Sequence, residues 1–162
     1  MRGLKLRQIQ DTFSEPLQGF VRDSGVRSSV LINRSGQVLA QHGFDKVFDL
    51  VGVASLAAGI NASSRALARQ LGEDEFEHLH HAGRSRQLFL GHFEAAGGQL
   101  MLVAVFDERS SIGLVRLFFE QFVANLRELP EMQIVRPAEN ARDFEADLES
   151  SLDRFFRDLI GG

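Results

Sequence analysis

The sequence contains no cysteine, no tryptophan and no tyrosine among its 162 residues, and each absence removes a class of chemistry. Without cysteine the chain forms no disulfide, holds no metal through thiolates and offers no cysteine nucleophile. All fourteen aromatic residues are phenylalanine, so no phenol or indole can stack on a ligand while also donating a hydrogen bond. The lack of cysteine agrees with a reducing compartment.

Lysine is almost as scarce, since Lys5 and Lys46 stand against sixteen arginines. No glycine-rich loop followed by lysine and a hydroxyl residue is present, which argues against that type of nucleotide-hydrolysing site. No glycine-flanked serine stands in a strand–turn–helix setting, so a serine nucleophile of that type is not indicated. The net charge of −4 argues against a general nucleic-acid-binding protein. We therefore expect a protein that is not itself an enzyme and that needs no nucleotide or other cofactor.

Long apolar runs are missing as well. We find no stretch of about 18 apolar residues and no signal-peptide core in the first ten residues. The sequence thus predicts a cytoplasmic protein without membrane insertion. Its length and its hydrophobic content of 44% predict one domain with a proper core and room for an appendage.

The residues that are present alternate between helical and strand periodicities. Pro16 interrupts the first helical pattern, so that helix is expected to be kinked or to start near Ser14 and Glu15. Ser110 or Ser111 is expected to cap the last core helix. The predicted fold is α+β, a five-stranded antiparallel sheet with a long helix between its second and third strands and helices at both ends. The expected elements are a helix over Leu6–Phe20, strands over Arg27–Asn33 and Gln37–His42, a helix over Phe48–Leu71, strands over Glu75–Ala82, Arg86–Glu94 and Gln99–Asp107, and a helix that reaches Glu128.

The long helix carries a stripe of small residues whose spacings of three and four place them on one side. Two glycines in a helix each cost roughly 1 kcal/mol relative to alanine, so a close contact should offset them. We expect the small side either to contact a second chain or to pack under the sheet of its own domain. The small residues are Gly52, Ser55, Gly59, Ala62 and Ala66. The large residues lie on a different side, which suits a core, and they are Val53, Leu56, Ile60, Leu67 and Leu71.

Charged and histidine side chains suggest few other sites. Asp107 and Glu108 form an acidic pair at a strand end, where stabilisation of the helix start is expected rather than catalysis. His78 and His80 share a strand face and His92 could lie opposite them, but exposed histidines are expected rather than a zinc site. An arginine offered to a bound nucleotide can stabilise phosphoryl transfer, yet each candidate is expected to be an ordinary surface arginine. The candidates are Arg65, Arg69, Arg84, Arg86, Arg109 and Arg116.

The chain ends in an acidic amphipathic segment. Residues 137–160 contain seven acids and three arginines, a balance of −4, so the rest of the chain sums to zero. We expect a core domain over residues 1–128, a linker over 129–142 and a helical tail over 143–162. An isolated helix of this length is marginal in water, so the tail should order only against a groove on its own dimer or on a partner. Its apolar side consists of Phe144, Leu148, Leu152, Phe155, Phe156 and Ile160.

The order of the elements and two segments resemble the roadblock (dynein light chain) family, and within it the MglB-like regulators of bacterial Ras-like GTPases. The segments are ASLAAGINASSRALARQLGEDEF (54–76) and VFDERSSIGLVRL (105–117). The resemblance covers residues 5–128, and the acidic tail is similar to the family's C-terminal extension. It implies a homodimer whose long helices lie side by side while the sheets join. It also implies activation of GTP hydrolysis by an MglA-type partner without an inserted arginine.

Under this resemblance the dimer and partner interface would comprise the small stripe together with Arg65 and Arg69. Two classes of function stay open. The first is a regulator of a Ras-like GTPase in cell polarity or motility, and the second is a non-catalytic roadblock scaffold that tethers such a complex. A small-ligand sensor of related shape is a third alternative, and concentration at a cell pole is left open.

Overall fold

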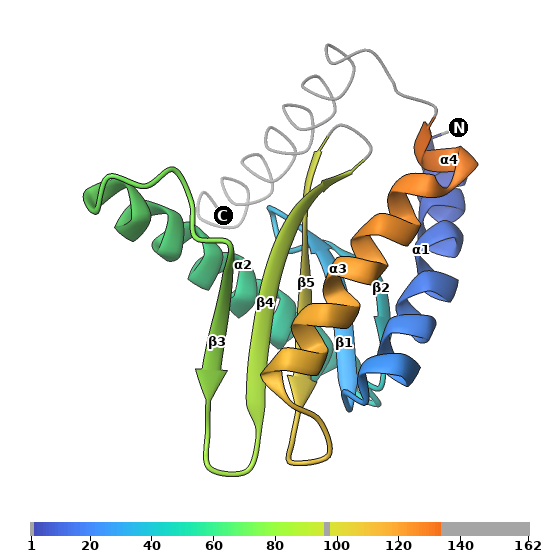
Figure 1. Cartoon of the computed structure of the whole chain (residues 1–162). Helices are drawn as coiled ribbons and strands as arrows, with labels where there is room; N and C mark the ends of the chain where they lie inside the picture. Colours follow the sequence, from blue (N-terminus) through green and yellow to red (C-terminus); the bar gives the residue numbers. More distant parts are fainter. Residues whose placement is uncertain (1, 96–97, 134–162) are drawn as a thin grey trace, which may run out of the picture.

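The computed structural model describes residues 2–95 and 98–133, which form a single sheet with helices on both faces (Figure 1). The order of helices and strands agrees with the order that the sequence predicts, apart from a short additional helix, α4, after the last core helix. The elements are α1 (Arg2–Ser24), β1 (Ser28–Asn33), β2 (Val38–His42), α2 (Val47–Gln70), β3 (His78–Ala82), β4 (Gln87–Ala95), β5 (Gly98–Phe106), α3 (Ile112–Glu128) and α4 (Pro130–Gln133).

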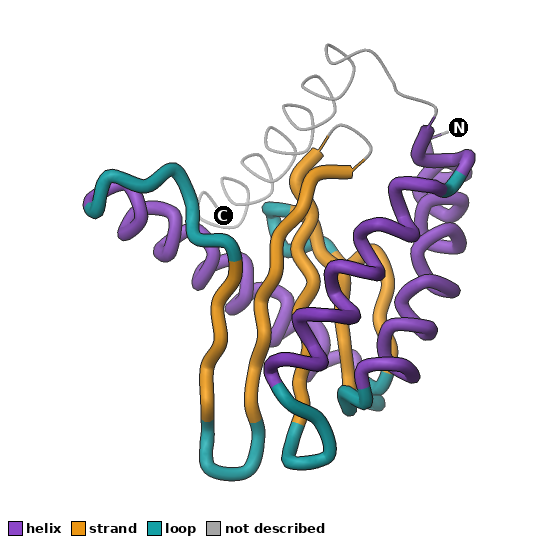
Figure 2. Tube along the Cα trace, in the orientation of Figure 1, coloured by secondary structure: helices purple, strands orange, loops and turns teal. Residues whose placement is uncertain are grey.

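The sheet is antiparallel throughout and has the order β2-β1-β5-β4-β3. The last strand in sequence, β5, therefore lies in the middle, where Val103 pairs with Val30 of β1 and with Leu90 of β4. Because helices cover both faces at this point, β5 is apolar along nearly its whole length. Figure 2 shows the three layers, with α1 and α3 on one face of the sheet and α2 on the other. Strands β2 and β3 form the two edges.

The larger core lies between the sheet and the pair α1 and α3. Phe13 and Leu17 of α1 are buried in it with Phe89 of β4 and Leu126 of α3. Of the two alternatives for the first helix, a start near Ser14 and Glu15 is wrong, because α1 runs from Arg2 to Ser24 with Pro16 inside it, and a kink at Pro16 stays a prediction. The buried residues on both sides of Pro16 are held in one core, and this packing keeps the two halves in one helix.

A second, smaller core lies between the sheet and α2. Large side chains of the sheet, such as Ile32, Met101 and Leu90, meet small residues of α2, such as Ala54 and Ala57. The small side chains on the helix allow its backbone to lie close to a sheet face that already carries large residues.

Local signals in the sequence place two element boundaries correctly and one wrongly. Ser111 caps α3, since its Oγ accepts a hydrogen bond from Leu114 N at 3.2 Å. Gly72 follows α2 with a φ of 81°, the left-handed region expected after a helix end. Strand β3, however, begins at His78 rather than at Glu75. The reason is that the carbonyl of Phe76 is bonded to the His92 side chain instead of to a strand.

Candidate partner-binding surface

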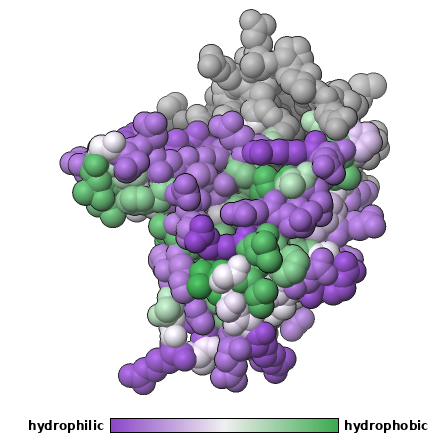
Figure 3. Space-filling view, in the orientation of Figure 1, coloured by the Kyte–Doolittle hydropathy of each residue, from purple (hydrophilic) through white to green (hydrophobic). Residues whose placement is uncertain are grey.

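The outward side of α2 is apolar and largely uncovered. Phe48 is 87% exposed and Leu56 is 71% exposed, and Val51 and Leu67 are also more than half exposed. Figure 3 shows apolar surface at the outer end of α2, on the left of the view. When several large apolar side chains are exposed together along one helix, they form a patch of the kind that marks a site of interaction with another molecule. We therefore treat the outward side of α2 as the candidate functional surface.

The small stripe that the sequence singles out lies on this outward side. Ser55, Gly59, Ala62 and Ala66 are exposed, and Gly52 is half-buried. A Cβ atom built on Gly52 or Gly59 would meet no other atom of residues 2–95 and 98–133 within 4 Å, so nothing in this part of the chain requires glycine there. The alternative that the stripe packs under its own sheet is therefore wrong.

The expectation that the bulky side of α2 enters the core is also wrong in large part. Leu56, Leu67 and Leu71 are exposed, whereas Val53 and Ile60 are partly buried beside the small core. The buried positions of α2 are instead Ala54, Ala57, Asn61 and Ala68. The sheet supplies the large side chains of this core, so the fully buried apolar positions of α2 are alanines, and the larger Leu50, Val53 and Ile60 pack only at its margin.

By length and composition alone, α2 could also cross a membrane. An 18-residue window of this helix has a mean hydropathy of 1.4, so the expectation that the chain has no such run was too strong. One helix of this kind is weak evidence for a membrane span, because a helix that packs in a soluble protein can be equally long and apolar. Only 11% of the window is buried, which again leaves a large apolar surface that the described residues do not cover.

The structure places Arg65 and Arg69 in different surroundings. Arg69 is exposed near the end of α2, whereas the Arg65 side chain is only 22% exposed and points into a polar cluster. In that cluster Arg65 Nε lies 3.6 Å from Glu75 Oε1, and Gln99 Nε2 donates to Glu75 Oε1 at 2.9 Å. His92 lies on the other side of the same carboxylate, with Nδ1 3.7 Å from Glu75 Oε2. The cluster thus ties the C-terminal half of α2 to β4 and β5.

The three strand histidines do not come together. His78 and His80 lie on the α1 and α3 face, stacked on Phe89 and Phe106 with ring centroids 5.8 and 5.9 Å apart. His92 points to the α2 face, so the expectation that it lies opposite the other two is wrong. Partial burial and the nearby charge of Arg116 lower the pKa of His78. Among the described residues, no three His, Asp or Glu side chains are grouped in a way that could hold a metal ion.

Asp107 has a more specific structural role than the sequence predicts. Its Oδ1 accepts a hydrogen bond from Arg109 N at 3.0 Å, and its Oδ2 forms an ion pair with Arg27 Nε. These bonds to Arg109 and Arg27 lower the pKa of the Asp107 carboxyl, so it stays ionised at neutral pH. The cap of α3 is Ser111, as expected, and stabilisation of the helix start by the acidic pair stays a prediction. Ser110 adds a second tie, because its Oγ donates to Ser24 O at 2.6 Å.

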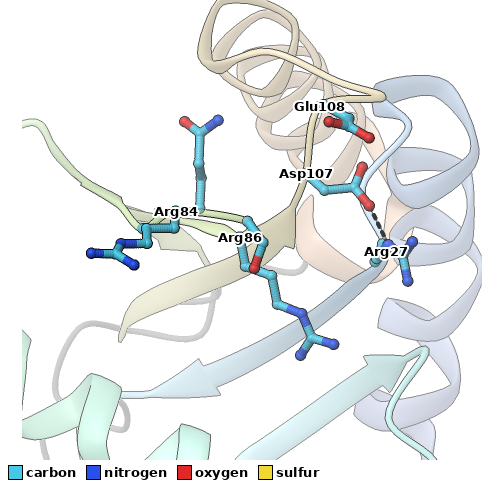
Figure 4. Close-up of a pocket in the computed structure, with 8 residues that line it drawn as sticks. Arg27, Arg84, Arg86, Asp107 and Glu108 are labelled. Carbon is cyan, nitrogen blue, oxygen red and sulfur yellow. Dashed lines mark hydrogen bonds and ion pairs between the residues drawn. The ribbon is translucent and has the colours of Figure 1, made fainter.

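The same loop borders a cavity of about 440 Å³ that sequence reasoning missed. The cavity lies between the turn that joins β3 to β4 and the loop after β5, and Figure 4 shows its lining side chains. Arg27 lies 80 residues from Asp107 in sequence, so no local pattern could have paired the two. The lining residues are Arg27, Gly83, Arg84, Ser85, Arg86, Gln87, Asp107 and Glu108.

The predicted tail lies outside the described residues. Its apolar positions, from Phe144 to Ile160, and its expected docking stay predictions, as does the division into a domain, a linker and a tail.

Comparisons with known proteins agree with the fold. The Roadblock/LC7 domain model matches residues 12–106. The gliding protein MglB from Thermus thermophilus is 34% identical, with a TM-score of 0.62, and the match covers 72% of this chain and 86% of that one. MglB from Myxococcus xanthus is 28% identical, with a TM-score of 0.61, and the match covers 74% and 91% of the two chains. A structure described as MglB with a tetrameric arrangement is 33% identical, with a TM-score of 0.62 and coverage of 78% and 88%. No curated protein matches the chain.

Proposed function

Because the chain belongs to the Roadblock/LC7 family and is an MglB-like roadblock protein, we propose that it is a homodimeric regulator of a Ras-like small GTPase of the MglA type. In this proposal the protein accelerates GTP hydrolysis by that GTPase and acts in cell polarity or motility. The proposal includes a cytoplasmic location. The observation that carries it is the apolar outward side of α2, which the rest of the described MglB-like fold leaves exposed.

Homodimer formation is supported by two features at the same edge of the sheet. Strand β3 is an edge strand, so one row of its backbone groups is unpaired within the sheet, and such a row can pair with a second copy. The C-terminal end of α2 extends beyond β3 at the left of Figure 1. The small stripe on α2 lets the backbone of a second helix come close, while Leu56 beside it adds apolar contact.

The proposed mechanism does not use an inserted arginine. Arg65 is engaged with Glu75 and is mostly covered, so it does not project from α2. Without an arginine from the regulator, acceleration has to come from repositioning the catalytic groups of the GTPase. A rigid apolar surface formed by two α2 helices could do this by binding one arrangement of the switch segments better than another.

The test is single-turnover GTP hydrolysis by an MglA-type GTPase with and without the full-length protein. Leu67→Ser removes an exposed leucine of α2, and Leu117→Ser makes the same change on α3, where the exposure is nearly equal, 56% against 55%. Burying about half of a leucine is worth about 1 kcal/mol, so Leu67→Ser should weaken stimulation about fivefold at limiting protein. Leu117→Ser should leave stimulation unchanged. Equal losses in both variants would contradict the assignment of the surface to α2.

The alternative is a non-catalytic roadblock scaffold that uses the same surface to tether a polarity or motility complex. If the GTPase binds the protein and Leu67→Ser weakens that binding, but hydrolysis is as fast without the protein, the scaffold is the correct function.

A further inference from the structure

The cavity between the β3–β4 turn and the β5–α3 loop has the composition of a site for negatively charged groups. Three of its lining residues are arginines, which come from the start of β1 and from the β3–β4 turn. We propose that this cavity is an oxyanion site, which binds a carboxylate or phosphate group. None of the lining residues belongs to α2, so the proposal does not depend on the proposed GTPase function.

The first arginine is held in place before any ligand arrives. Arg27 Nε is bound to Asp107 Oδ2, and the Asp107 side chain is only 11% exposed. That carboxylate is itself fixed, because its other oxygen accepts from Arg109 N and the loop is tied to Ser24 through Ser110. A guanidinium group bound through Nε still has its two terminal nitrogens as donors, and fixing the group in advance lowers the entropy lost on binding.

The other two arginines are presented by a tight turn. Gly83 N donates to Arg86 O at 2.9 Å and closes the turn, and a Cβ on Gly83 would lie only 2.6 Å from that oxygen. Glycine is therefore required there, and the turn fixes where Arg84 and Arg86 leave the chain. Neither guanidinium has an ion pair or hydrogen bond with the described residues. In Figure 4 the side chain of Arg86 extends toward the same side of the sheet as that of Arg27.

The charge balance of the cavity favours an anion. Asp107 is already compensated by Arg27, and in Figure 4 the Arg84 side chain extends away from both of them. The Glu108 carboxylate lies on the other side of Asp107 from the Arg86 guanidinium, so Arg86 is left beside Arg27 without a counter-charge from the described residues. A positive site stands out on a chain whose net charge is −4. Arginine suits this chemistry because its planar fork can give two parallel hydrogen bonds to the oxygens of one carboxylate or phosphate group.

The test is an NMR titration of the ¹⁵N-labelled full-length protein with inorganic phosphate and, separately, with succinate, each against sodium chloride at equal ionic strength. We expect saturable shifts confined to the amides of residues 83–87 and 107–108. Arg86→Gln should weaken binding about tenfold or more, the loss of one charge-assisted hydrogen bond. Arg22→Gln is the matched control, because Arg22 is an exposed arginine whose one described partner is its neighbour Asp23. It should bind as the wild type does.

The two probes separate the sources of the anion. Binding of phosphate alone assigns the site to phosphate groups, and binding of succinate as well extends it to carboxylates. Shifts that do not saturate, or equal weakening in Arg86→Gln and Arg22→Gln, would overturn the proposal. Because Arg86 is exposed on a turn, its variant should unfold at the wild-type temperature, and that measurement excludes a folding defect as the cause of lost binding.

Discussion

Replacement of Gly59 by leucine separates the stability of the protomer from the stability of the proposed dimer. Gly59 lies on the outward side of α2, and a Cβ there would meet none of the described residues within 4 Å. A leucine side chain therefore has free space in one copy. It also removes a helical glycine, so the protomer should gain about 0.5–1 kcal/mol of stability.

The same leucine would stand between two α2 helices in the proposed dimer. Forcing extra carbons into a packed contact costs about 1–3 kcal/mol, and a two-fold interface contains the change twice. The dimer should therefore lose about 2–6 kcal/mol, which raises its dissociation constant by roughly 30-fold to 10⁴-fold. The predicted signature is a more stable protomer that dimerises less well.

The assay is sedimentation equilibrium over a range of protein concentrations, with unfolding measured in urea. Gly113→Leu is the matched control, because Gly113 is an exposed glycine of α3 whose Cβ would meet only Ser111 Oγ, at 3.9 Å. It should leave the dissociation constant unchanged. A wild-type monomer at micromolar concentration, or equal effects of the two variants, would refute the reasoning.

Four further predictions concern the partner, the tail, the pH dependence and nucleotide binding. Alanine at each of Arg65, Arg69, Arg84, Arg86, Arg109 and Arg116 in turn should leave most of the GTPase stimulation, and a loss of about 10³-fold at any one would indicate an arginine finger. Deletion of residues 138–162 should leave the dimer and its melting temperature nearly intact while it changes partner affinity or nucleotide turnover, whereas an unfolded product would show that the tail is part of the core. The pKa of His78 is lowered in the fold, so near this pKa the folded chain binds fewer protons than the unfolded chain. The free energy of unfolding should therefore fall as the pH drops below about 6.5. Thermal unfolding of His78→Gln should show a smaller decline over the same pH range. Calorimetry should detect no GTP binding to the isolated protein, and a measurable affinity would contradict the assignment of a pure regulator.

Much of the fold could be read from local patterns. The alternation of helical and strand periodicities gave the order of the elements because each amphipathic segment has one side to bury, and this requirement is encoded within the segment. The serine cap of α3 and the glycine after α2 are also local, since they depend on groups only a few residues away. The small stripe was recognisable for the same reason, because spacings of three and four fix a common side of a helix without reference to the rest of the chain.

Which side of a helix faces the core and which faces outward was decided by the tertiary structure. Periodicity shows that α2 has a small side and a bulky side, but not which of them meets the sheet. The sheet face already carries Ile32, Met101 and Val103, so alanines fit against it and Leu56 stays exposed. The contacts that join Arg27 to Asp107 and Arg65 to Glu75 depend in the same way on how strands and loops meet in space. The sequence alone determined which elements form, and only packing determined which surfaces remain for partners.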